Sequence, residues 1–316
     1  MSPCKLFSNL ATAASIERGP FFQRLPTTLS MTRLFRFFSV WPLAVLHVMG
    51  GALGWLVWGF SASYRQRFRA NVALAGVSFS DARPAIAEAG RFVAELPRLW
   101  MRPRGQSCLG NVTVQGRHHA EAAFAQGRGV IFFAPHCGCF ELEPQALAEL
   151  FAPQHGPITA IYRPARQAWL AELQVMARDR PGLQVVPASM SGIRLMSRAL
   201  KDKGAVALLT DQVPPQGQGI WAPFFGQPAY TMTLAARLAL QSGAVMLPVS
   251  CDRLPRGRGY VLSFWPALQG MSALSKTDLL AAVTLINQSI ETLVRRQPGQ
   301  HLWSYARYKT PRQEPM

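Results

Sequence analysis

The polarity of the chain changes sharply after its first quarter. Residues 37–64 contain no charged side chain, and their apolar run includes FFSVWPLAVLHVMGGALGWLVWGF. A bilayer core is crossed by about 20 apolar residues, so this run is long enough to span it. Pro42, His47 and the glycines Gly50, Gly51 and Gly54 interrupt the run, and a helix or hairpin lying in one leaflet is the alternative. We therefore predict a membrane-anchoring segment over residues 31–70, preceded by a flexible N-terminal extension over residues 1–30. Met31 is an alternative start to Met1.

Beyond Asp81, short apolar runs alternate with stretches of helical periodicity. The predicted strands lie at 112–114, 130–134, 158–162, 183–187, 205–209, 245–250 and 260–265, with predicted helices at 118–126, 139–151, 166–179, 191–202, 231–242 and near 279–293. Such alternation predicts an α/β fold with a mostly parallel central sheet and helices on both faces. We find no repeat and no linker, so residues 71–316 are expected to form one domain.

Composition narrows the partners of this domain. Charged residues make up 16% of the chain, below the roughly 25% usual for soluble domains, and the mean hydropathy is +0.09. Lysine and arginine outnumber aspartate and glutamate by 33 to 16, for a net charge of +17. This balance favours an anionic membrane or a phosphorylated substrate. Nucleic acid is the competing partner, but the basic residues are spread out and form no aromatic-basic module, so we expect none.

The stretch GVIFFAPHCGCFEL at 129–142 holds the candidate chemistry. A buried strand ends at Ala134, and His136 follows at the strand edge where open α/β sheets bind ligands. Glu141 is five residues further on, a separation that on a continuous helix would point the side chains about 140° apart. The two can meet only if His136 precedes the helix. His136 is then a candidate general base and Glu141 the carboxylate that orients it, although a structural histidine beside a glutamate is the alternative.

Other chemistries lack their residues. The chain has no G-x-S-x-G elbow and no phosphate-binding glycine loop, so a covalent mechanism would depend on Cys137 or Cys139. His136 with these two thiols makes a poor zinc site because no second cysteine pair exists. We expect no metal and no cofactor. The five cysteines show no framework spacing and are expected to be free thiols in a reducing compartment.

Several stretches, in order along the chain, resemble those of the lipid A late acyltransferases, the lauroyl and myristoyl transferases of the lysophospholipid acyltransferase superfamily. The stretches are His136 to Glu141, Tyr162-Arg163-Pro164, Thr210-Asp211-Gln212, PFFGQPAYT at 223–231, and Leu302-Trp303 with Arg307. The resemblance covers most of the chain. It differs at Cys139-Phe140, where the family commonly has Asn-Trp, which leaves acyl length and acceptor lipid open.

The resemblance implies a glycerolipid-acyltransferase-like catalytic domain over residues 71–316. Its activity would be acyl transfer from acyl carrier protein to a hydroxyl of a phosphorylated glycolipid, a lipid A precursor, on the cytoplasmic side of the inner membrane. His136 and Glu141 would be the base and its partner. Arg163 would contact phosphate or the carrier, Asp211 would order the site, and Arg307 would contact substrate phosphate.

Local chemistry leaves alternatives for each of these residues. Arg163 and Arg307 could be solvated surface arginines, and Asp211 a helix or loop cap. For the whole chain, the alternatives are acyl transfer to another lysophospholipid or glycolipid, and a non-catalytic membrane lipid-binding protein. Glycerophosphate-type acyltransferases rank second to the lipid A family, because the Glu-Gly-x-Arg block that they usually carry is missing from this sequence.

Overall fold

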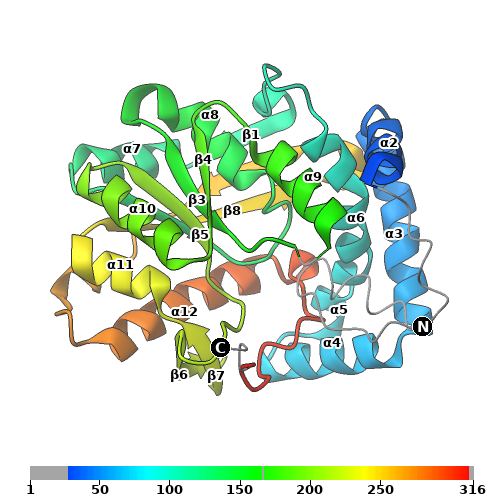
Figure 1. Cartoon of the computed structure of the whole chain (residues 1–316). Coiled ribbons are helices and arrows are strands. Elements are labelled where there is room, and N and C mark those ends of the chain that lie inside the picture. The colour runs from blue at the N-terminus through cyan, green and yellow to red at the C-terminus, as the bar shows by residue number, and fades with distance from the viewer. Residues whose placement is uncertain (1–27, 166, 313–316) are drawn as a thin grey trace.

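A seven-stranded sheet forms the centre of the protein, in a computed structural model that describes residues 28–165 and 167–312 (Figure 1). The strand order is β1-β9-β8-β2-β5-β3-β4, and every neighbouring pair is parallel except β8 and β9. The strands are β1 (Val112–Gln115), β2 (Val130–Ala134), β3 (Ile158–Tyr162), β4 (Leu183–Pro187), β5 (Ala205–Leu209), β8 (Val245–Arg253) and β9 (Tyr260–Phe264). The predicted α/β fold with a mostly parallel sheet is confirmed.

Helices cover both faces of this sheet, as predicted. One face packs against α7 (Arg117–Ala125), α8 (Glu143–His155) and α9 (Ala168–Arg178), and the other against α10 (Met190–Lys201), α11 (Leu234–Ser242) and α12 (Leu279–Arg296). All five residues of β2 are buried, and they alternate between the two cores: Phe132 belongs to the first, Ile131 and Phe133 to the second. Burial on both faces explains why β2 reads as a continuous apolar run.

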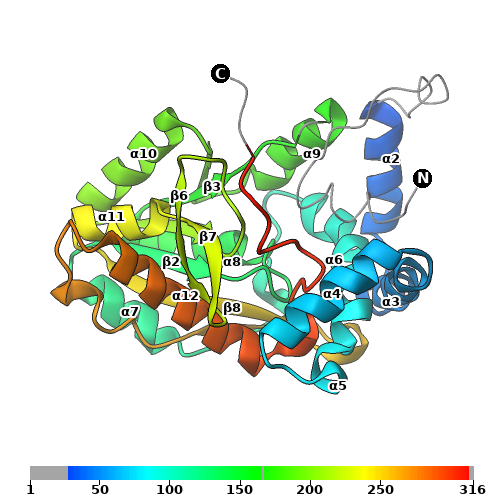
Figure 2. The same ribbon diagram turned by 90° about the horizontal axis from the view of Figure 1, so that it is seen from below.

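A two-stranded hairpin projects beyond the sheet (Figure 1) and lies beside α12 (Figure 2). It pairs β6 (Gly219–Phe224) with β7 (Gln227–Met232). Phe225 and Gly226 form the two-residue turn, both with positive φ, as a hairpin turn of the primed type requires. The helix predicted from residue 231 therefore begins later, at Leu234, because residues 231 and 232 still belong to β7.

From residue 28 onward, five α-helices precede the sheet: α2 (Thr28–Ser39), α3 (Leu43–Phe60), α4 (Ala62–Leu74), α5 (Phe79–Ala82) and α6 (Pro84–Trp100). The predicted anchoring segment comprises most of α2, all of α3 and much of α4. Of the predicted extension, residues 1–27 lie outside the described residues, and the last three belong to α2.

The helix α3 is the one described helix that is long and apolar enough to cross a membrane, and 39% of it is buried inside the protein. Its buried side lies against α6 at backbone contact, since a Cβ on Gly54 would overlap the carbonyl of Ile86 and a Cβ on Gly90 would overlap that of Gly50. Its other side is open: Val48 and Phe60 are 73% and 76% exposed.

Candidate active site

His136 and Asp211 meet where two neighbouring strands end. The strands β2 and β5 pair in parallel with Ala134 opposite Leu209, so the residues that follow them emerge at the same edge of the sheet. The Nδ1 atom of His136 lies 2.5 Å from Asp211 Oδ1, and the main-chain N–H of His136 donates to Oδ2 at 2.9 Å. The two carboxylate oxygens of Asp211 thus bind the ring and the main chain of His136.

The charge of Asp211 is stabilised at this position. Burial by itself would raise the pKa of Asp211, but the charge and the hydrogen bonds of His136 lower it to about 2. A carboxylate accepts hydrogen bonds only, so Nδ1 of His136 carries the proton and Nε2 is left as the acceptor of the ring. This tautomer is the one that a general base for a hydroxyl group needs.

Glu141 does not occupy the place predicted for it. Trp100 Nε1 donates to its Oε2 at 3.2 Å, and Arg178 Nη2 donates to its Oε1 at 3.1 Å. The prediction that Glu141 orients His136 is therefore corrected, because Asp211 makes the hydrogen bond to Nδ1. Between the two residues the chain turns at Gly138, whose φ is +59°, and the loop directs Glu141 toward α6 and α9.

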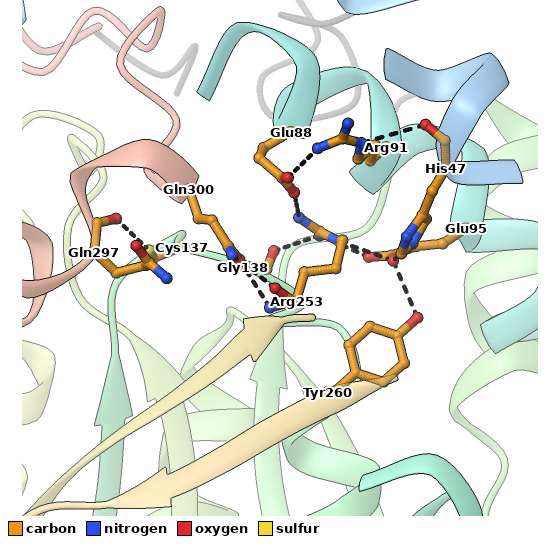
Figure 3. A network of polar contacts seen from close by, with 10 residues as sticks. All are labelled: His47, Glu88, Arg91, Glu95, Cys137, Gly138, Arg253, Tyr260, Gln297 and Gln300. Atoms are coloured by element: carbon orange, nitrogen blue, oxygen red, sulfur yellow. Dashed lines mark hydrogen bonds and ion pairs between the residues drawn. The ribbon is translucent and has the colours of Figure 1, made fainter. Parts of the chain in front are cut away.

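A buried ionic network holds this loop in place (Figure 3). Arg253 Nη2 donates to the Gly138 carbonyl at 2.8 Å and to Glu95 Oε1 at 2.7 Å. Burial alone would raise the pKa of Glu95, but Arg253 and His47 lower it to about 2. Tyr260 also donates to Glu95, at 3.0 Å. The network connects α3, α6 and β8 to the turn that follows the candidate base.

His136 lines a cleft of about 440 Å³, a volume that includes space open to solvent. The C-terminal segment and the hairpin supply most of its wall, which is rich in aromatic rings. Its lining residues are Asn71, His136, Asp211, Gln212, Phe224, Phe225, His301, Leu302, Trp303, Tyr305, Arg307 and Tyr308. We refer to this space as the aromatic cleft.

A second space of about 610 Å³ lies between the sheet and α8, lined mainly by apolar side chains of β2, β3, β5 and α8. We refer to it as the apolar pocket. Phe140 lines it and also packs edge-on against His136, with 4.7 Å between ring centroids. Glu141 and Arg178 lie in its wall as well. His136, which lines the aromatic cleft, thus packs against an aromatic side chain that lines the apolar pocket.

The remaining predicted residues lie around the aromatic cleft. Arg163 is exposed just beyond the end of β3, near enough to Tyr305 and Lys309 to influence the pKa of each. Arg307 is buried in the wall and donates to the Tyr230 carbonyl at 2.9 Å and to Thr231 Oγ1 at 2.6 Å. Its guanidinium therefore fastens the C-terminal segment to β7, and the phosphate contact predicted for it stays a prediction.

The thiols of the candidate loop have separate environments. Cys137 Sγ donates to the Gln297 carbonyl, and Cys139 interacts with Cys251. Burial raises the pKa of both Cys137 and Cys139, which disfavours the thiolate that a nucleophile or a metal ligand requires. Within residues 28–165 and 167–312, no group of three histidine, cysteine or acidic side chains is placed to hold a metal ion.

Sequence reasoning missed two parts of the site. Arg253 and Glu95 support the loop from positions more than a hundred residues apart, and no local pattern connects them. The aromatic cleft also contains His301, which follows α12 and pairs with Cys137 in an isolated bridge. A single histidine near the end of the chain gives no signal that it reaches the edge of the sheet.

Comparison with known proteins finds several acyltransferases that are similar to this chain. The lipid A biosynthesis palmitoleoyltransferase of Escherichia coli (strain K12) is 29% identical over 198 residues, 62% of this chain and 61% of the relative. The lauroyltransferase of lipid A biosynthesis from the same strain is 28% identical over the same coverage. A phosphatidylinositol mannoside acyltransferase of Mycobacterium tuberculosis (strain ATCC 25618 / H37Rv) is 27% identical over 158 residues, 49% of this chain and 48% of the relative.

The chain thus spans less than two thirds of the length of each of these relatives. A family model covers far more of it: the model described as bacterial lipid A biosynthesis acyltransferase matches residues 30–310, from α2 to the segment that closes the aromatic cleft. With that match, the protein belongs to the bacterial lipid A biosynthesis acyltransferase family.

Proposed function

We propose that the protein transfers a fatty acyl chain from an acyl carrier protein thioester to a hydroxyl of a lipid A precursor. The observation that carries this proposal is the His136–Asp211 pair, 2.5 Å apart at the edge of the sheet and open to the aromatic cleft. The family match supports the reaction class, and the names of the Escherichia coli relatives support the acceptor. The carrier protein as donor comes from the resemblance in the sequence.

In the proposed reaction, Nε2 of His136 removes the proton of the acceptor hydroxyl while its oxygen attacks the thioester carbonyl. The tetrahedral intermediate then expels the thiolate of the donor, which takes the proton from the imidazolium, and the ester product forms. Asp211 stabilises that imidazolium and holds the ring in place. A positioned base of this kind contributes about 10²–10⁴-fold to the rate, and close placement of both substrates contributes more.

The two spaces beside His136 suit the two substrates. We assign the acyl chain to the apolar pocket, because its wall is formed by side chains such as Leu147, Ala160 and Val185. We assign the polar part of the acceptor to the aromatic cleft, because aromatic faces with polar groups between them suit a sugar-containing lipid. Phe140 then stands beside the reacting carbonyl and influences how far the chain enters.

We also propose that the protein binds the cytoplasmic leaflet of the inner membrane without spanning it. One side of α3 is occupied by α6 along the glycine contacts, so only the opposite side can face lipid. That side carries exposed apolar residues, and α2 adds exposed Arg33 and Arg36 next to them. An anionic leaflet complements such a surface. The exposed apolar residues of α2, of α3 and of the turn between them are Leu34, Phe37, Val40, Val45, Val48, Met49, Trp55, Leu56 and Phe60.

A phosphorylated mannolipid is the second candidate acceptor, favoured by the likeness to the mycobacterial relative. The test incubates the purified protein with acyl carrier protein bearing chains of several lengths and either a tetra-acylated lipid A precursor or a phosphatidylinositol mannoside. Mass spectrometry identifies the product. We expect one added acyl group on the lipid A precursor. Transfer only to the mannoside would show that the acceptor is the mannolipid and not the lipid A precursor. No transfer to either lipid would refute the proposed function.

The variant His136→Gln is expected to lose this transfer, and His118→Gln, which changes an exposed histidine on α7, serves as its matched control. Binding to vesicles containing anionic phospholipid is measured separately. Replacing Val48 and Phe60 with serine should weaken that binding while leaving transfer to a detergent-dispersed acceptor close to wild type.

A further inference from the structure

The aromatic cleft contains a second imidazole, that of His301. This residue follows the short helix η5 (Pro298–Gln300) and forms an antiparallel bridge with Cys137. The next residue, Leu302, donates its main-chain N–H to the carbonyl of His136 at 3.2 Å. Main-chain contacts on both sides therefore fix His301 beside the catalytic loop, in the same cleft as His136 and Asp211.

The ring of His301 is held in its neutral form. Burial lowers the pKa of His301 to about 4, the charges of His136 and Arg307 act in the same direction, and the charge of Asp211 opposes them without reversing the shift. A hydrogen bond between the ring and the main chain of His136 also acts to raise the pKa, and it does not reverse the shift either. An imidazole this weakly basic cannot serve as a second proton acceptor for a hydroxyl at neutral pH.

One nitrogen of this ring is left without a partner. The Nδ1 atom of His301 is buried and has no hydrogen-bond partner among the described residues. Since Nδ1 has no partner, we attribute the interaction of the ring with the main chain of His136 to Nε2; in a neutral ring with Nε2 as the donor, Nδ1 carries a lone pair and can only accept. Buried polar atoms are almost always paired, so an unpaired acceptor in the wall of a substrate cleft indicates a donor on the ligand.

We propose that Nδ1 of His301 accepts a hydrogen bond from a second donor group of the acceptor lipid, a hydroxyl or amide N–H near the hydroxyl that reacts. This proposal rests on the proposed function and deepens it. The two histidines divide the work: His136, with its carboxylate, removes the proton, and His301, without one, holds the acceptor in register. The edge-on packing of Trp303 against His301, 4.8 Å between centroids, fixes the orientation of the ring.

Three variants separate the role of Nδ1 from a structural role of the ring. In His301→Asn the side-chain amide lies near the position of Nδ1, and in His301→Gln it lies near that of Nε2. The variant His301→Phe keeps the ring shape and removes both nitrogens. Steady-state kinetics with the tetra-acylated lipid A precursor and acyl carrier protein thioester give KM for each substrate. Thermal unfolding checks that each variant is folded.

The loss of one neutral hydrogen bond corresponds to about a tenfold change. We therefore expect KM for the acceptor to rise about tenfold in His301→Phe and His301→Gln and about threefold or less in His301→Asn. The KM for the thioester should stay at the wild-type value in all three. Equal effects of Asn and Gln, or a parallel rise of both KM values, would overturn the proposal in favour of a structural role. Wild-type kinetics in all three would also overturn it.

Binding of the same lipid A precursor in detergent, without any donor, distinguishes this proposal from the proposed function. If the wild type binds the precursor more tightly than His301→Phe but transfers nothing, the proposed function fails and the contact stands. If the wild type transfers acyl groups and all variants bind like it, the contact fails alone. If the wild type neither binds nor acylates the precursor, both fail.

Discussion

The protein contains two histidine–carboxylate pairs with similar geometry. His136 Nδ1 lies 2.5 Å from Asp211, and His47 Nε2 lies 3.0 Å from Glu95. Both carboxylates are buried, and the neighbouring groups bring the pKa of each to about 2 against the effect of burial. The burial and the pKa of the carboxylate therefore do not distinguish the two pairs.

Their surroundings separate them. Glu95 is shared among His47, Tyr260 and the Nε and Nη2 atoms of Arg253, and His47 is only 3% exposed. Asp211 gives both of its oxygens to His136, whose ring faces the aromatic cleft. A pair of this kind serves as a general base when the ring reaches a substrate space and the carboxylate stabilises its imidazolium. Where an arginine already compensates the carboxylate, the pair stabilises the fold.

The largest effect is expected from Asp211→Asn. The amide cannot stabilise an imidazolium, and its N–H₂ group favours the wrong tautomer of His136, so acyl transfer should fall by about 10²–10⁴-fold. The rate is measured with carrier protein thioester and lipid A precursor, beside circular dichroism spectra that establish the fold. A rate within a few-fold of wild type would assign the base to another residue.

Glu95→Gln should affect stability instead of chemistry. Removing the fully buried partner of this ion pair leaves Arg253 with the more exposed Glu88, and the free energy of unfolding should drop by about 3–5 kcal/mol. Urea denaturation measures it, with Glu88→Gln as the matched control, since Glu88 is the more exposed carboxylate bound to the same arginine and should cost less. The turnover of the folded fraction should stay close to wild type. A large loss of turnover without a loss of stability would contradict the distinction between the two pairs.

A third histidine, His301, should make the stability of the protein depend on pH. The pKa of His301 is lowered to about 4 from an ordinary value near 6.5. Between these pH values the imidazole is protonated in the unfolded chain and neutral in the folded protein. Stability should therefore fall between pH 6.5 and 4, by on the order of 3 kcal/mol from this group. Denaturation midpoints measured across that range should be less pH-dependent in His301→Asn than in wild type. An unchanged slope would show that the ring takes up its proton in the folded state.

The smallest effect is expected from Glu141→Gln. Its carboxylate bonds to Trp100 and Arg178 in the wall of the apolar pocket and makes no hydrogen bond to His136. Transfer should fall by about tenfold or less. The substitution weakens the hydrogen bond from Arg178 and displaces a residue of the pocket wall, whereas His136 keeps its bond to Asp211. Competition between thioesters of different lengths should reveal a shift in the preferred chain. A loss as large as that of Asp211→Asn would restore Glu141 as the orienting carboxylate.

Sequence alone could predict the parts of this protein that depend on local pattern. The alternation of apolar runs with helical periodicity gives the layered fold, and the end of the run at Ala134 places His136 at the edge of the sheet. The partner of His136 depends instead on β5 lying between β2 and β3, an order that no periodicity encodes. For that reason Glu141, five residues away, was the expected partner, and Asp211, 75 residues away, is the actual one. The hairpin was missed because its strands belong to no repeating alternation.

The glycine contacts between α3 and α6 have a mechanical consequence. Backbones that touch at Gly50, Gly54 and Gly90 leave no room for either helix to roll or slide, and α6 carries Glu95, which reaches the turn at Gly138 through Arg253. With the outer face of α3 seated in a leaflet as proposed, the height of the His136 imidazole above the lipid would be fixed by the thickness of two helices. The acceptor would then need to rise only part of the way out of the leaflet to react.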